Sequence, residues 1–103
     1  VRIASLEDIG LMKIGAVIGR GSRKDFVDLY TICQRMPLSE LLVLAPKKFR
    51  AATNFRWQAL KALCFFEDAD REPPILTPHP LDWKRVKQFF VHEVRTLTRA
   101  TLR

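Results

Sequence analysis

Hydrophobic residues recur at helical intervals along most of this chain. Apolar side chains three and four positions apart share one face of a helix, whereas strict alternation is typical of a strand. On this basis we expect five helical segments: from Ser5 to about residue 19, from Ser22 to the residue before Pro37, about 38–52 with an interruption or kink at Pro46, about 54–66, and 82 to about 100. Ser5 and Ser22 are predicted to cap the first two, because each is followed three positions later by an aspartate, as in a capping box. The buried stripe of the last helix is predicted to contain Trp83, Val86, Phe90, Val94 and Leu97. The pattern predicts an all-α fold, a single compact bundle of about five helices.

The remaining segments are short or rich in proline. Residues 1–4 alternate in the manner of a strand but are too few to form a sheet, so we expect a short N-terminal strand remnant. Residues 67–80 hold four of the six prolines and show no periodicity, which predicts an extended surface loop. No internal repeat or composition break divides the chain, and residues 1–103 are expected to form one helical domain.

Glycine is concentrated in the first predicted helix and its exit. Each glycine inside a helix lowers its stability by up to about 1 kcal/mol relative to alanine. Either a packed helix or a ligand is therefore expected to approach this backbone closely. The glycines are Gly10, Gly15, Gly19 and Gly21. The apolar face of the same helix is predicted to contain Ile9, Met12, Ala16 and either Val17 or Gly19.

The net charge is +7 with a pI near 10.0, which is compatible with a polyanionic partner such as RNA. The basic residues are dispersed, so charge alone favours nucleic acid only weakly. The longest apolar run, residues 41–46, is too short to cross a membrane, and the N-terminus lacks the layout of a signal peptide. We therefore expect a cytoplasmic protein with no membrane partner.

No metal site with histidine or cysteine ligands is predicted. Cys33 and Cys64 form no CxxC motif and are expected to be reduced and buried, with a disulfide as the alternative. His79 and His92 are far from each other and from both cysteines. The acidic residues within 67–70 could hold a hard cation, but a solvated turn is the better expectation.

The turn between the first two helices concentrates the residues that could carry chemistry. Lys13 and Arg20 are seven positions apart and share a face, as do Asp25 and Asp28, three apart. One interpretation is structural: Asp25 caps its own helix, Lys24 pairs with Asp28, and the arginines are solvated. The other is functional: the lysine neutralises a phosphate, and the aspartate acts as a base or aligns a hydroxyl.

At these residues the chain resembles the C-terminal motifs of the AbiEii-type nucleotidyltransferase family, which includes toxins of bacterial toxin–antitoxin pairs. The resemblance is carried by residues 5–9, Met12-Lys13, Arg20, 23–26 and 28–30, and it extends over 60–70 and 83–90. It therefore covers nearly the whole chain.

The resemblance implies a reaction and a division of roles. Lys13 would contact the triphosphate of a bound NTP, and Asp25 would position or activate the acceptor, plausibly RNA; both would be catalytic. Arg20 and Arg23 would bind substrate, and Asp28 would be mainly structural.

The family's catalytic half precedes this region and holds Mg²⁺ with a Gly-Ser turn and paired acids on strands. Neither motif occurs before Lys13 in this chain. We therefore expect the chain to be inactive alone and to use no cofactor by itself, with Mg²⁺ and NTP bound only by the complete enzyme. The implied partners are an N-terminal half, an antitoxin or RNA.

Two other interpretations remain open. The chain could be a non-catalytic helical module that binds a protein or RNA, with Lys13 and Asp25 serving the fold. It could also be the remnant of a degenerate gene or an artificially shortened protein.

Overall fold

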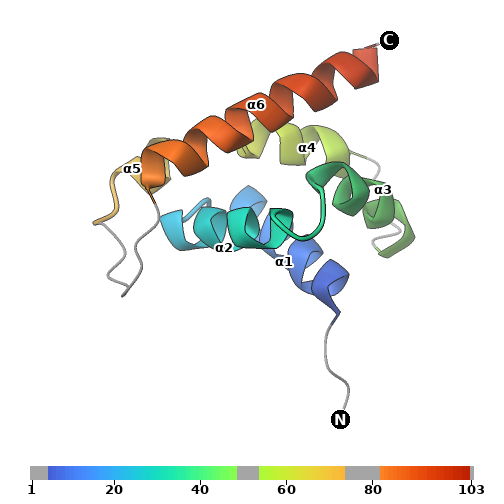
Figure 1. Cartoon of the computed structure of the whole chain (residues 1–103), viewed down its shortest axis with the longest axis horizontal. Coiled ribbons are helices and arrows are strands. Elements are labelled where there is room, and N and C mark those ends of the chain that lie inside the picture. The colour runs from blue at the N-terminus through green and yellow to red at the C-terminus, as the bar shows by residue number, and fades with distance from the viewer. Residues whose placement is uncertain (1–4, 49–53, 74–81, 103) are drawn as a thin grey trace.

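The structure, a computed structural model, describes residues 5–48, 54–73 and 82–102, which form helices and connecting turns without a strand (Figure 1). The all-α prediction is therefore confirmed, while the expected strand at residues 1–4 lies outside the described residues. The helices are α1 (Leu6–Gly19), α2 (Arg23–Cys33), α3 (Leu38–Lys48), α4 (Phe55–Ala62), α5 (Glu67–Asp70) and α6 (Trp83–Leu102).

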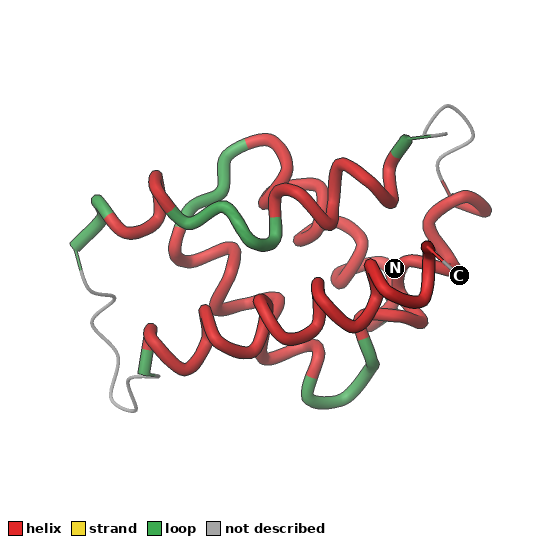
Figure 2. Tube along the Cα trace, turned by 90° about the horizontal axis from the view of Figure 1, so that it is seen from above, coloured by secondary structure: helices red, strands yellow, loops and turns green. Residues whose placement is uncertain are grey.

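The helices form a bundle around α1 and α2. α1 packs against α2, α3 and α4, and the long α6 crosses over α2 and α4 (Figures 1 and 2). α5 lies beside the start of α2, and the chain reaches α3 at the opposite end (Figure 1). The hinge between α1 and α2 is therefore close to residues that follow it by about fifty positions.

The core is shared by α1, α2, α3, α4 and α6. Phe26 of α2 is fully buried, and its ring centroid lies 5.2 Å from that of Phe66, 5.8 Å from that of Trp83 and 5.7 Å from that of Phe90. Burying one large apolar side chain contributes about 1.5–3 kcal/mol. This aromatic cluster ties α2 to α6 and so fixes the N-terminal turn of α2. Other core residues are Leu11, Ile14, Val17, Leu29, Leu38, Leu41, Leu60, Leu63, Val86 and Leu97.

Both predicted serine caps are present. The Ser5 Oγ accepts a hydrogen bond from the Asp8 N–H at 3.1 Å, and the Ser22 Oγ accepts one from the Asp25 N–H at 3.2 Å. Between the two helices Gly21 has a φ of 61°, a conformation that glycine adopts most easily. Its N–H reaches the Ala16 carbonyl at 3.2 Å and closes the end of α1.

The predicted apolar face of α1 is wrong at Ile9 and Met12, which are 37% and 66% exposed, and Ala16 is half-buried. Of the two alternatives for its last position, Val17 is buried and Gly19 is exposed; the buried face also contains Gly10, Leu11 and Ile14. α1 is apolar on nearly every side, its charged residues being Glu7, Asp8 and Lys13, so periodicity could not identify its inner face. Its neighbours α2, α3 and α4 decide which face is covered.

The glycines of α1 have different surroundings. A Cβ on Gly10 would lie 2.8 Å from a methyl of Leu41, so a packed helix explains this glycine. Gly15 and Gly19 have no atom within 4 Å of the same position and face outward.

Three boundaries differ from the prediction. α3 continues through Pro46 to Lys48 without interruption, and α4 ends at Ala62 instead of near Phe66. Residues 67–70 form the short helix α5 where a loop was expected. This turn is held from a distance, because the N–H of Arg23 donates to Glu72 and the Arg23 side chain donates to the Ala69 carbonyl. Local sequence carries no sign of these contacts.

Both cysteines are free thiols, as predicted, but only Cys33 is shielded from water; Cys64 is exposed, so the expectation of two buried thiols is wrong. Burial, together with the nearby Glu93, raises the pKa of Cys33 to about 12. The described helices include none with the length and apolar character required to cross a membrane.

Candidate functional site

Asp25 is the one charged residue that is buried in the described part of the chain, and its side chain is 3% exposed. It lies in the first turn of α2, one turn after the capping Ser22. An isolated buried carboxylate would be costly, so its partners determine what the site can do.

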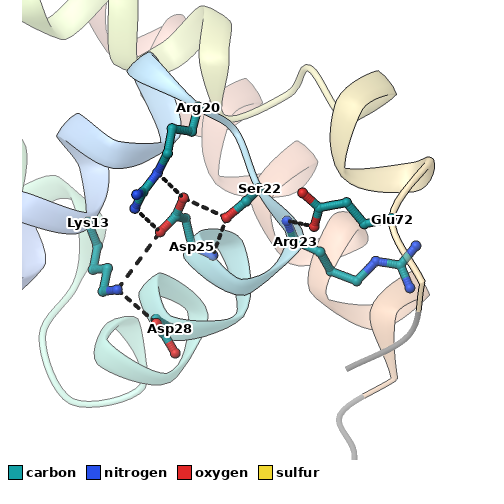
Figure 3. A network of polar contacts seen from close by, with 7 residues as sticks. All are labelled: Lys13, Arg20, Ser22, Arg23, Asp25, Asp28 and Glu72. Atoms are coloured by element: carbon teal, nitrogen blue, oxygen red, sulfur yellow. Dashed lines mark hydrogen bonds and ion pairs between the residues drawn. The ribbon is translucent and has the colours of Figure 1, made fainter. Parts of the chain in front are cut away.

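Three side chains converge on this carboxylate (Figure 3). Arg20 donates from Nε to one oxygen at 3.3 Å and from a terminal nitrogen to the other at 3.0 Å, a two-pronged contact. The Ser22 hydroxyl donates to the first of these oxygens at 2.6 Å. The Lys13 ammonium lies 3.8 Å from the second. We call Lys13, Arg20, Ser22, Asp25 and Asp28 the hinge cluster.

Asp28 extends the hinge cluster by one turn of α2. Its carboxylate lies 2.8 Å from the Lys13 ammonium, so the lysine bridges both aspartates (Figure 3). The expected pair between Lys24 and Asp28 is replaced by this contact across the two helices. The expectation that the arginines are solvated is correct only in part. Arg20 is 71% exposed but is bound to Asp25, and Arg23 is half-buried.

The pKa of Asp25 reflects opposing influences. Burial raises it, but hydrogen bonds from Ser22 and Arg20, with the charges of Arg20 and Lys13, outweigh burial and hold the pKa of Asp25 below its usual value. A carboxylate with a lowered pKa and occupied oxygens is a weak proton acceptor. The geometry therefore favours Asp25 as a residue that positions the two cations.

The hinge cluster turns its cations outward. The Lys13 side chain is 27% exposed and that of Arg20 is 71% exposed, while the acid between them is covered. A guanidinium has N–H donors beyond those that Asp25 accepts, and these can bind an anion. The arrangement suits contact with phosphate oxygens.

Arg23 does not join the hinge cluster. Its guanidinium donates to the carbonyls of Ala69 and Asp70, at 3.2 and 3.4 Å, and lies 4.9 Å from the ring centroid of Trp83. Figure 3 shows it directed away from Asp25, beside Glu72. Of the four residues predicted for the site, the structure brings together Lys13, Arg20 and Asp25 and uses Arg23 to hold α5 and α6.

The described residues do not fit a metal ion. They contain no group of three histidine, cysteine, aspartate or glutamate side chains that could share one. Asp25 and Asp28 are both bound by cations, and Asp70 of the acidic run accepts hydrogen bonds from Trp83 and Lys87. His92 is exposed on α6, and His79 lies outside the described residues.

The sequence did not predict two of the side-chain contacts around the hinge. Ser22 was expected only as a cap, yet its hydroxyl also donates to the Asp25 carboxylate. Glu72 accepts the N–H of Arg23 at 2.8 Å from 49 positions away. The capping-box spacing of Ser22 and Asp25 was a signal for the first contact. The second has no local signal.

Comparisons with known proteins give one informative relative. The chain is 38% identical over 96 residues to an uncharacterized protein of Aquifex aeolicus (strain VF5). The aligned region covers 90% of this chain but 44% of the relative, so the chain spans less than half of that protein's length. No family model matches the chain. No solved structure matches it significantly.

Proposed function

We propose that this chain is the C-terminal helical part of a nucleotidyltransferase-like protein of the AbiEii type. In it, Lys13 and Arg20 contact the phosphates of an NTP, and Asp25 holds both cations in position. The reaction of the complete protein is transfer of a nucleotide to an acceptor such as RNA. In this proposal the metal ligands belong to another part of the protein, so the helical part by itself is inactive.

The observation that carries the proposal is the convergence of Lys13 and Arg20 on one buried carboxylate. Lys13 lies in α1 and Arg20 caps its end, about two turns later. Without a shared carboxylate, the two cations would repel each other and sample many rotamers. Asp25 fixes them side by side with donors free for an anion. Preorganised donors of this kind are what transfer of a phosphate ester requires, because the reaction depends mainly on position and charge.

A second observation supports the placement of a missing half. The outer face of α1 carries Ile9, Met12 and the unfilled positions beside Gly15 and Gly19. On a helix wheel this apolar face borders Lys13 and Arg20 directly. A further domain that covers the face would lie next to both cations. The longer Aquifex protein provides a precedent for additional chain of that size.

No metal ligand is assigned to this chain, because its acids near the site are bound by cations. Mg²⁺ would belong to the other half, and the present residues hold and orient phosphate. Arg23 is assigned a structural role through its contacts with α5.

Reconstitution tests the proposal. The chain is mixed or co-expressed with an N-terminal half that carries the Gly-Ser turn and the paired acids, and labelled NTP is supplied with RNA and Mg²⁺. We expect labelling only when both parts are present, and a loss of at least about a hundredfold for Lys13→Ala, because a charge contact to the reacting phosphate is removed. Lys24→Ala, an equal change of charge on α2, is the matched control.

Two results would contradict the proposal. Labelling by the chain alone would show that no second half is needed. Full activity of Lys13→Ala in the reconstituted enzyme would show that the lysine makes no contact with the reacting nucleotide.

The alternative, a non-catalytic helical module, is favoured by one feature. No buried side-chain polar atom in the described residues lacks a hydrogen-bond partner, as expected of a hinge built only for stability. In that case Lys13→Ala would lower the stability of the chain, and no combination with a second half would label RNA.

A further inference from the structure

Two exposed aromatic side chains, one in α4 and one shortly after its end, flank an exposed lysine in the sequence. Trp57 is 44% exposed, Phe65 is 54% exposed, and Lys61 is exposed between them. Trp57 and Lys61 are four residues apart within α4 and therefore share a face, about 6 Å apart along the axis. Phe65 follows one turn later, just past the end of the helix. We call Trp57, Lys61 and Phe65 the aromatic row.

The aromatic row continues into an open hollow of about 510 Å³. Lys61, Ala62 and Phe65 line one side of it, and Ile18 to Gly21 line the other. Gly19 leaves its part of the wall open, since no atom lies within 4 Å of where its Cβ would be. Arg20 therefore joins the hollow to the hinge cluster.

We infer that the aromatic row and this hollow bind single-stranded RNA. Bases of a single strand are free to stack on exposed aromatic rings, and every base offers a flat face for this contact. Lys61 and Arg20 supply positive charge where the backbone would run, on a chain whose net charge is +7. Asp68, which also lines the hollow, can accept hydrogen bonds from base amino groups.

The features favour RNA over a protein partner. The centre of a protein–protein interface is depleted of lysine. Here a lysine stands between the two aromatic residues, where a nucleic-acid phosphate would pair with its charge. A duplex is disfavoured because its bases are stacked on each other and cannot reach the rings.

The inference deepens the proposed function, since it describes where an RNA acceptor would lie, but its test uses neither nucleotide nor a second half. If the row fails to bind RNA, labelling in the reconstituted enzyme can still occur with another acceptor. If reconstitution fails, RNA binding by the chain alone can still be measured.

The experiment titrates the full chain into fluorescein-labelled oligouridylate of about twelve nucleotides, within the range of single-strand site sizes, and follows anisotropy. We expect saturable binding to the single strand and much weaker binding to a duplex of equal length. Trp57→Ala and Phe65→Ala should each weaken binding by about 5- to 100-fold, the range found when one stacked base is lost. The matching DNA strand separates recognition of ribose from stacking alone.

Charge and shape are tested separately. Lys61→Ala should reduce the slope of log affinity against log salt by about 0.7, the value for one phosphate contact on a single strand. Lys24→Ala removes the same charge from α2 and should leave the slope unchanged. Trp57→Phe retains a ring and should keep most of the affinity. It is the control that separates loss of stacking in Trp57→Ala from loss of the fold. Phe65→Leu keeps apolar bulk without a ring and should bind like Phe65→Ala.

Three results would overturn the inference. Equal affinity for duplex and single strand would show that the chain binds RNA through charge alone and not through stacking. If Trp57→Ala and Phe65→Ala both bind RNA with wild-type affinity and have unchanged circular dichroism, the aromatic row does not contact RNA. Full affinity in Phe65→Leu would show that the ring of Phe65 does not stack on a base.

Discussion

Two aspartates in this molecule make nearly the same contacts in opposite surroundings. Asp25 at the hinge accepts hydrogen bonds from Arg20 and Ser22, lies 3.8 Å from the Lys13 ammonium, and has a side chain that is 3% exposed. Asp70 at the end of α5 accepts from the Trp83 indole at 2.7 Å and the Lys87 ammonium at 3.0 Å, and its side chain is 45% exposed. The pairs differ in burial far more than in geometry.

The difference determines what each acid can do for the protein. Water competes for the contacts of Asp70 and screens its charge, so exposed pairs of this kind contribute little to stability. Asp25 is covered, and its contacts with two cations are correspondingly stronger. We conclude that the contacts of Asp25 contribute more to the stability of the fold than those of Asp70.

Removing each carboxylate gives the largest expected contrast. Asp25→Ala should lower the free energy of unfolding by about 2–3 kcal/mol, because charged hydrogen bonds are lost from a buried position. Asp70→Ala should leave the midpoint of urea unfolding almost unchanged. The measurement is urea denaturation of the two variants and the wild type, followed by circular dichroism. Equal destabilisation by the two variants would show that burial does not strengthen the contacts of Asp25 relative to those of Asp70.

Acid should reveal the same contrast with a smaller effect. Burial raises the pKa of Asp25, but hydrogen bonds from Ser22 and Arg20 lower it by more. Hydrogen bonds from Trp83 and Lys87 lower the pKa of Asp70. Each carboxylate therefore adds stability above its unfolded pKa, near about 3.9, and that contribution is lost as the pH falls through the lower folded value.

The test of this pH dependence compares unfolding of the wild type with Asp25→Asn and Asp70→Asn from neutral pH to pH about 2. The stability gap between wild type and Asp25→Asn should be constant near neutrality and close as the pH falls below about 4. The gap for Asp70→Asn should be small throughout. A gap for Asp25→Asn that widens in acid would mean that its pKa is raised in the folded protein.

The sequence predicted most of the fold where local signals are strong. The serine caps and the stripe of Val86, Phe90 and Leu97 on α6 followed from spacing, since α6 has one clearly apolar face. The inner face of α1 did not, because that helix is apolar almost all round and its orientation depends on α2, α3 and α4. α5 was missed for the same reason: its contacts with Arg23 come from 46 and 47 positions away.

The candidate site was predictable as a set of residues but not as an arrangement. Spacing and the family resemblance placed Lys13, Arg20 and Asp25 near one turn. That Arg20 folds back onto Asp25 depends on the positive φ of Gly21, which sets the angle between the helices. The separation of Arg23 from the cluster depends on Glu72, a residue that no local pattern connects to the hinge.

The most direct test of the central claim, that Asp25 holds Lys13 and Arg20 as phosphate contacts, compares two arginines in one titration. The Nε–H groups of Arg20 and Arg23 both donate within the protein, at 3.3 Å to Asp25 and 3.2 Å to the Ala69 carbonyl. Both signals are followed by ¹H–¹⁵N NMR as inorganic tripolyphosphate is added to the full chain. We predict that the Arg20 signal shifts saturably, that Asp25→Asn weakens this binding, and that the Arg23 signal stays in place. An unmoved Arg20 signal at the highest concentration, or an equal shift of Arg23, would contradict the account.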